Sequence, residues 1–261
     1  MLVMLTGCSG PPTYARAVAP ESAAGSARSR PGVWPGAWPD PDVRAGLWPS
    51  PRIGVRARRA RVRPAGPLCP VPTSLTGSID RTRPDQVLFV TGQGTRARVV
   101  GCERVGDGYI QVLGPFAAWI GRHGTAPRAA KREGDGRTPS GVFSLRSGFG
   151  TARNPGLATG FGWFKAGRRD VWVDDPRSRL YNTHQQRPVR GRWRSAEKLR
   201  IEPYRTAQVI GYNQARTPGR GSAIFLHVST GRPTAGCVAL PAAHLRAVMR
   251  WERANAMIAI S

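Results

Sequence analysis

From about residue 73 onward, the chain is a series of short runs of β-branched, aromatic and other apolar residues separated by glycine, proline and aspartate. Runs of this length between turn-forming residues are typical of strands in all-β sandwiches and barrels. We predict strands over residues 86–91, 96–105, 108–114, 141–145, 170–173, 206–212, 223–228, 237–240 and 256–261. The pattern therefore predicts a mostly β fold.

One segment near the C-terminus departs from this pattern. Leu245, Val248 and Met249 recur at helical spacing, and the charged Glu252 follows them. This spacing places the apolar side chains on one face of a helix. Pro241 precedes the segment, and proline is well suited to the first turn of a helix. We therefore expect a mostly β domain with one or two helices.

The first 72 residues have a different composition. They contain 13 of the 24 prolines and three Trp-Pro pairs, and no apolar periodicity persists for more than a few residues. Such a segment buries too little apolar surface to offset the entropy cost of folding. We therefore divide the chain into a disordered Pro/Arg-rich linker over residues 9–72 and a folded domain over residues 73–261.

Residues 1–8 end in Leu5-Thr6-Gly7-Cys8, which fits the motif at which bacterial lipoproteins are lipidated on cysteine. The basic segment and the apolar core of about 7–15 residues that a secretory signal needs are missing. Either the match arises by chance, or Met1 truncates a signal that starts upstream. Under the second interpretation, Cys8 is a lipid anchor that attaches the protein to a membrane, and residues 9–72 are its tether.

The formal net charge is +25, from 40 Lys+Arg against 15 Asp+Glu. A field of this sign attracts polyanions, which include nucleic acid, an anionic membrane and an anionic cell wall. We do not expect nucleic acid to be a partner, because the chain has no recognisable nucleic-acid-binding motif. The arginines of residues 52–63 are interpreted as a solvated basic linker, since no folded face presents them.

Four cysteines and four histidines are scattered along the chain without a CxxC pair or an HExxH sequence. This spacing does not predict a metal site, and no cofactor is expected. Cys69 and Cys102 could form a disulfide in an oxidising compartment. Their spacing leaves that pairing open.

The segment that carries chemistry is the pair of apolar runs around His227 and Cys237. We predict that the two runs form an antiparallel hairpin whose nine-residue connection brings the imidazole close to the thiol. A thiolate is the reactive form of cysteine, and a neighbouring imidazole can take the thiol proton. Gly236 would let the backbone approach a substrate, with N–H groups near Gly236 and Cys237 facing an oxyanion. The alternative is a buried cysteine that serves as a small hydrophobe beside a structural histidine.

At these residues the sequence resembles the L,D-transpeptidase (YkuD-type) family. One motif is Ile224-Phe-Leu-His227 followed by Thr234-Ala-Gly-Cys237, and the other is Asp135-Gly-Arg-Thr-Pro-Ser-Gly-Val-Phe143. Both occur in the order that the family shows, and the resemblance covers roughly residues 85–261. It implies a β-sandwich-like catalytic domain in the cell envelope, outside the cytoplasmic membrane. It also implies that peptidoglycan stem peptides are the substrates and that they form a thioester on the enzyme.

Carried over residue by residue, the resemblance assigns Cys237 as nucleophile, His227 as base, Gly236 as the glycine before the nucleophile and Thr234 as the Ser/Thr position. After acylation, the stem peptide would pass to the side-chain amine of a neighbouring stem.

The sequence also departs from the family at several positions. Ala235 replaces a common histidine, Ala239 replaces a common arginine or asparagine, and the spacing from histidine to cysteine is shorter than in most members. Arg232 could replace the missing arginine in binding a substrate carboxylate. Tyr181 and Asn182 are further candidates, for binding the ammonium group of a substrate.

Two alternatives to a transpeptidase remain open. A hydrolase would form the same thioester and resolve it with water. A catalytically weak or inactive peptidoglycan-binding module would keep the fold, and the alanines at 235 and 239 favour that interpretation.

Overall fold

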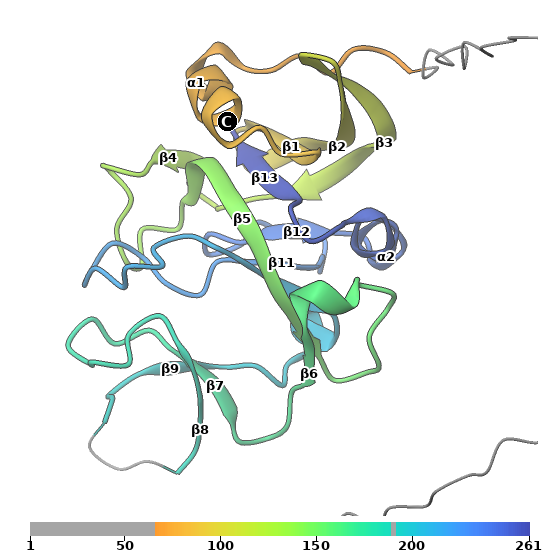
Figure 1. Ribbon diagram of the computed structural model, residues 1–261. Coiled ribbons are helices and arrows are strands. Elements are labelled where there is room, and N and C mark those ends of the chain that lie inside the picture. The colour runs from red at the N-terminus through yellow and green to blue at the C-terminus, as the bar shows by residue number, and fades with distance from the viewer. Residues whose placement is uncertain (1–65, 189–191) are drawn as a thin grey trace, which may run out of the picture. The chain divides into compact units, whose positions relative to one another are not determined.

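The computed structural model describes residues 66–188 and 192–261, and most of their strands join in a single sheet (Figure 1). The strands of this sheet are β1 (Gln86–Gln93), β2 (Arg96–Val105), β3 (Gly108–Trp119), β4 (Thr125–Pro127), β5 (Thr138–Gly150), β6 (Trp163–Lys165), β10 (Ala207–Ile210), β11 (Phe225–Val228), β12 (Val238–Leu240) and β13 (Met257–Ile260). A second, three-stranded sheet contains β8 (His184–Gln186), β7 (Asp170–Val173) and β9 (Ala196–Lys198), in that order.

Two α-helices and two 3₁₀ helices accompany the sheets. They are α1 (Thr73–Thr82), α2 (Ala242–Trp251), η1 (Thr159–Phe161) and η2 (Glu202–Arg205). The predicted class, a mostly β fold with one or two helices, is confirmed. Within the described residues, neither α-helix is long and apolar enough to cross a membrane.

The large sheet closes on itself through β5. The first half of β5 pairs with β13, with Phe143 opposite Ile258, and the second half pairs with β10, with Phe149 opposite Ala207. The order β10-β11-β12-β3-β2-β1-β13-β5 therefore returns to β10. One face of every strand in this ring points inward, because side chains alternate along a strand.

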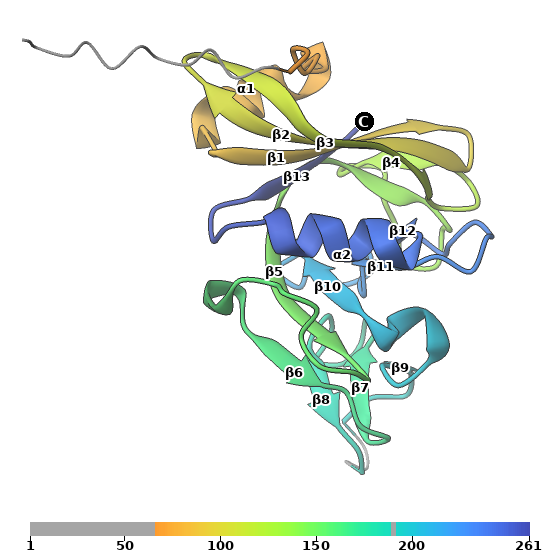
Figure 2. The same cartoon turned by 90° about the vertical axis from the view of Figure 1, so that its right-hand side faces the viewer.

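The main apolar core lies inside this closed sheet. Leu88, Leu226, Leu240 and Ile258 come from four different strands, and all four are fully buried there. Helix α2 lies between the β1–β3 part of the sheet and the β10–β11 part (Figure 2) and buries the predicted stripe that includes Leu245. The periodicity in the sequence therefore predicted the buried face of α2 correctly.

A smaller core lies on the outer face of β1 and β2, under α1. Leu75 and Ile79 of α1 pack there with Phe89 and with the disulfide between Cys69 and Cys102. Helix α1 was not predicted, because its sequence TSLTGSIDRT contains a glycine, three threonines and only two buried apolar residues. These residue types have weak helix propensity, so packing holds this helix in place.

The predicted linker extends too far toward the C-terminus. Residues 66–72 belong to the folded part: Leu68 bridges Ile110, and the amide of Cys69 donates to the carbonyl of Tyr109 at 2.9 Å. The disulfide and these backbone bonds fix a segment that composition alone assigned to the linker. The rest of the predicted linker, with Cys8, lies outside the described residues.

The disulfide generates a testable prediction about stability. Replacing Cys69 and Cys102 together with alanine should lower the free energy of unfolding by about 3–4 kcal/mol, because the bridge closes a loop across a sequence separation of 33. Urea unfolding measures the change. A reducing agent should destabilise the wild type and leave the double variant unaffected. Equal stability of the oxidised wild type and the double variant would contradict this role.

Candidate active site

The site depends on the pairing of β11 with β12. These strands run parallel, with Leu226 opposite Val238 and His227 opposite Ala239. Directly paired residues of a ladder share a face, and alternate residues along a strand share it too. His227 and Cys237 therefore lie on the same face of the sheet, while Leu226 and Val238 face the main core.

The predicted antiparallel hairpin is therefore wrong. The connection after β11 first crosses to the segment that follows β3. There, Thr234 donates its N–H to the Ile120 carbonyl at 2.9 Å and accepts from the N–H of Arg122, also at 2.9 Å. The chain then returns and enters β12 in the same direction as β11. A hairpin was expected because the connection is short, and these contacts with a distant segment redirect it.

A cavity of about 520 Å³ opens on the face that carries His227 and Cys237. His227 of β11 and Cys237, which directly precedes β12, line it, and so do Glu197 of β9 and Tyr204 of η2. Charged groups are prominent in the lining, which includes Lys131, Glu133, Asp174, Glu197 and Arg232.

Cys237 is the only free cysteine among the described residues, and it is 6% exposed. Its sulfur accepts the N–H of Phe225 at 3.3 Å, and its S–H donates to the carbonyl of Ala223 at 3.3 Å. Burial, together with the negative charge of Glu197, raises the pKa of the thiol to about 12. The resting side chain is therefore a neutral thiol.

His227 is also buried, with 7% of its surface exposed. Its Nδ1 lies 2.9 Å from the carbonyl oxygen of Val228. Because a carbonyl can only accept, Nδ1 carries the hydrogen, and the lone pair of the neutral ring is on Nε2. Burial lowers the pKa of His227 to about 4, so the ring is neutral at neutral pH and can accept a proton through Nε2.

The backbone around Cys237 is held by two threonines. Thr138 and Thr234 both donate their hydroxyl groups to the carbonyl oxygen of Cys237, at 3.3 and 2.7 Å. The hydroxyl of Thr138 also accepts the N–H of Gly121 at 2.8 Å. The Thr-Pro pair of the Asp135–Phe143 motif is the first part of β5, and Thr138 directly contacts the segment that contains the cysteine.

Gly236 occupies a position that another residue would strain. Its φ is +151°, and a Cβ atom there would lie 2.9 Å from the carbonyl oxygen of Arg137. The N–H of Gly236 donates to the hydroxyl of Thr234 at 3.1 Å. That N–H is therefore engaged in the resting site and would have to leave Thr234 before it could contact a substrate oxyanion.

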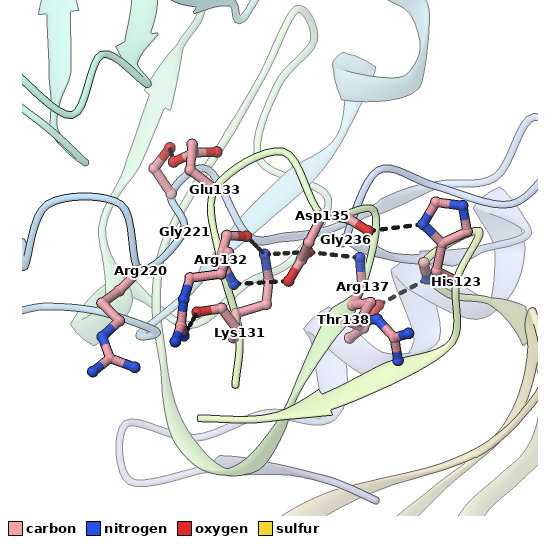
Figure 3. Close-up of polar contacts among 12 residues, drawn as sticks. His123, Lys131, Arg132, Glu133, Asp135, Arg137, Thr138, Arg220, Gly221 and Gly236 are labelled. Carbon is pink, nitrogen blue, oxygen red and sulfur yellow. Dashed lines mark hydrogen bonds and ion pairs between the residues drawn. The ribbon is translucent and has the colours of Figure 1, made fainter. Parts of the chain in front are cut away.

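The loop before β5 is organised by Asp135 (Figure 3). Its carboxylate accepts from Lys131 Nζ at 2.8 Å, from the N–H of Arg132 at 2.7 Å and from the N–H of Arg137 at 2.9 Å. Burial alone would raise the pKa of Asp135, but these hydrogen bonds outweigh it and lower the pKa. The bond from Nζ holds the side chain of Lys131, which is 2% exposed, at the wall of the cavity.

Five of the predicted site residues line this one cavity: Cys237, His227, Gly236, Thr234 and Arg232. Tyr181 and Asn182 are outside its lining. The hydroxyl of Tyr181 donates to Glu133, and the amide of Asn182 bonds to the carbonyls of Tyr212 and Asn213. Their polar groups are thus used within the protein.

Several residues of the cavity wall were not predicted from the sequence. Lys131 and Glu133 directly precede the Asp135 motif, so extending that motif toward the N-terminus would have found them. Asp174 directly follows β7 and belongs to neither motif. Glu197 and Tyr204 occur in short segments without a motif. The packing of η2 against β11 brings Tyr204 to the cavity, and the pairing of β9 with β7 positions Glu197.

Comparison with known protein families identifies the family of this chain. The family of L,D-transpeptidase catalytic domains (YkuD) matches residues 84–259, which is more than half of the chain. The chain belongs to this family. No curated protein and no solved structure matches it significantly. In this L,D-transpeptidase domain, one motif lines the cavity through His227 and Cys237, and the other is joined to it by the hydrogen bond from Thr138 to the Cys237 carbonyl.

The threonine contacts lead to a prediction. Thr138→Val keeps the shape of the buried side chain but leaves the Gly121 N–H without its acceptor, so the domain should lose about 1–3 kcal/mol of unfolding free energy. Thr138→Ser retains the hydroxyl and is the matched control. Chemical denaturation of both variants measures the difference. An unchanged Thr138→Val protein, or an equal loss in Thr138→Ser, would show that the hydroxyl does not hold this segment.

Proposed function

We propose that this domain is a cysteine acyltransferase that acts on peptidoglycan stem peptides, with Cys237 as nucleophile and His227 as base. The observation that carries the proposal is the placement of the thiol and the imidazole on one face of a parallel strand pair, inside one cavity. The family to which the chain belongs supports the substrate class.

The reaction would begin with proton transfer from the Cys237 thiol to Nε2 of His227. The sulfur attacks a carbonyl carbon of the stem peptide and forms a tetrahedral oxyanion. When this intermediate collapses, the C–N bond breaks and the imidazolium gives its proton to the departing amine, which leaves a thioester on Cys237. An acceptor amine then attacks the thioester, loses a proton to His227 and forms the new amide, and the sulfur recovers a proton.

The resting site is neutral, so charge must develop during the reaction. The raised pKa of Cys237 and the lowered pKa of His227 both oppose a thiolate–imidazolium pair before substrate binds. The N–H of Phe225 already points at the sulfur and would stabilise a thiolate there. We infer that the pair ionises only as the sulfur attacks, when the negative charge passes on to the substrate oxygen.

The departures from the family motif can be interpreted in the same terms. Ala239 is 1% exposed and lies opposite His227 in the ladder. A charged side chain at position 239 would therefore have to lie in the buried region next to the His227 ring. Lys131 and Arg232 are the cationic residues of the cavity lining. We propose that they bind the carboxylates of the stem peptide in place of the missing arginine.

We further propose that the protein works in the cell envelope. The disulfide between Cys69 and Cys102 supports this compartment, because disulfides persist in oxidising surroundings. Attachment to a membrane through a lipidated Cys8 remains part of the proposal. Fractionation of native cells with Cys8→Ala as the comparison tests it.

The nucleophile assignment predicts covalent labelling at a single residue. A carbapenem, which acylates nucleophilic thiols, should add its mass once to the protein, on the peptide that contains Cys237. Cys237→Ala should take up no label. His227→Gln should slow labelling by roughly a hundredfold or more, since a general base contributes a factor of that size. His123→Gln is the control, because His123 is exposed and outside the cavity lining.

Intact-mass spectrometry and peptide mapping give the result. Label on Cys237→Ala, or equal rates in the two histidine variants, would refute the assignment.

A further inference from the structure

Tyr204 is a buried tyrosine beside the proposed catalytic pair. It is 5% exposed, although it belongs to the short 3₁₀ helix η2. Its ring meets the ring of His227 edge-to-face at a centroid distance of 5.2 Å and the ring of Phe225 in the same manner at 5.4 Å. These contacts fix the position of the Tyr204 hydroxyl in the cavity that also contains Cys237.

The hydroxyl of Tyr204 donates a hydrogen bond of 2.5 Å to Oε1 of Glu197. Glu197 lies on β9 of the small sheet, and it lines the same cavity as His227 of β11. The hydrogen bond therefore connects the small sheet to the face that carries the thiol. It also determines where the only proton of this hydroxyl points.

Glu197 sits in surroundings that disfavour its charge. The charged or titratable groups that face it are Tyr204 from η2, Asp174 after β7, Glu133 from the loop before β5 and Cys237 directly before β12. Burial, followed by the charges of Asp174 and Glu133, raises the pKa of Glu197 to about 7 against the hydrogen bond from Tyr204. The carboxyl group thus titrates near neutral pH.

Glu197 and Tyr204 affect the pKa of the Cys237 thiol in opposite directions. After burial, the charge of Glu197 is the next largest cause of the raised pKa of the thiol. Hydrogen bonding with the Tyr204 hydroxyl acts the other way and lowers the pKa. A single hydroxyl proton cannot serve both acceptors fully, so a bond to ionised Glu197 withholds it from the sulfur.

We propose that Glu197, acting through the Tyr204 hydroxyl, is a positioning residue that keeps Cys237 a protonated, unreactive thiol while its carboxylate is ionised. When Glu197 becomes neutral, its charge no longer opposes a thiolate, and the Tyr204 hydroxyl can turn to the sulfur. The reactivity of Cys237 is thereby coupled to the charge state of a residue on a different sheet. This inference rests on the proposed role of Cys237 as nucleophile.

The test measures the alkylation rate of Cys237 by iodoacetamide as a function of pH, read by mass spectrometry of the Cys237 peptide. The reagent is small, and it reports the thiolate whether or not the protein transfers stem peptides. Failure of this test and failure of the proposed function are therefore distinguishable. Lack of a carbapenem adduct counts against the function, and an unchanged alkylation profile counts against the coupling.

Glu197→Gln removes the charge and keeps the shape and the hydrogen-bond acceptor. Between about pH 8, above which wild-type Glu197 is ionised, and the thiol pKa, we expect the variant's alkylation profile to lie about one pH unit lower, which is about a tenfold higher rate. Glu202→Gln is the matched control, because Glu202 begins the same 3₁₀ helix but its side chain is 74% exposed. Its profile should coincide with that of the wild type. A Glu197→Gln profile that does not move, or an equal shift in Glu202→Gln, would overturn the proposal.

Two further measurements isolate the hydroxyl and avoid dependence on one variant. Adding Tyr204→Phe to Glu197→Gln should reverse part of the gain in rate, whereas an unchanged rate would show that the hydroxyl takes no part. In the wild type, the logarithm of the rate should rise with a slope below one between about pH 6 and 8, because ionisation of Glu197 there opposes ionisation of the thiol. A slope of one throughout that range would contradict the coupling, and this measurement needs only the wild-type protein.

Discussion

The parallel pairing of β11 with β12 is the constraint on which the rest of the site depends. It gives Cys237 and His227 a common face and turns Leu226 and Val238 into the main core. Because side chains alternate along a strand, a slip of one residue in either strand would bury one of the two proposed catalytic groups in the core and expose an apolar side chain. The apolar core therefore enforces the register that the proposed chemistry needs. The contacts of Thr234 with the segment after β3 set the direction in which the chain enters β12.

Charge is distributed unevenly between the chain and its cavity. The sequence as a whole has a net charge of +25, yet Glu133, Asp174 and Glu197 all line the cavity beside the thiol. In a partly desolvated site, these carboxylates act on the thiol more strongly than distant surface arginines, whose charges are screened by solvent and salt. The overall charge thus governs long-range attraction to anionic polymers, whereas burial and the nearby charge of Glu197 keep Cys237 a neutral thiol at rest.

The sequence predicted those features that depend on local patterns. The positions of the longer strands followed from turn residues, the buried stripe of α2 from periodicity, and the candidate pair Cys237 and His227 from motif spacing. The three-residue strands β4, β6, β8 and β9 were not predicted. The sequence did not predict the direction of β12, because that depends on hydrogen bonds between Thr234 and residues more than a hundred positions away. Glu197 and Tyr204 have no sequence signature either, since they reach the cavity only through tertiary packing. The disulfide remained open because two cysteines at irregular spacing do not specify a pair.

The central claim is that Cys237 carries the acyl group of a stem peptide as a thioester. The most direct measurement is intact-mass spectrometry of the protein, quenched in acid shortly after mixing with a peptidoglycan stem-peptide donor. The account predicts a species heavier by the donor minus its departing amine, with the added mass on Cys237 and released by hydroxylamine. Consumption of the donor without any such species in the wild type, or the same species in Cys237→Ala, would contradict it.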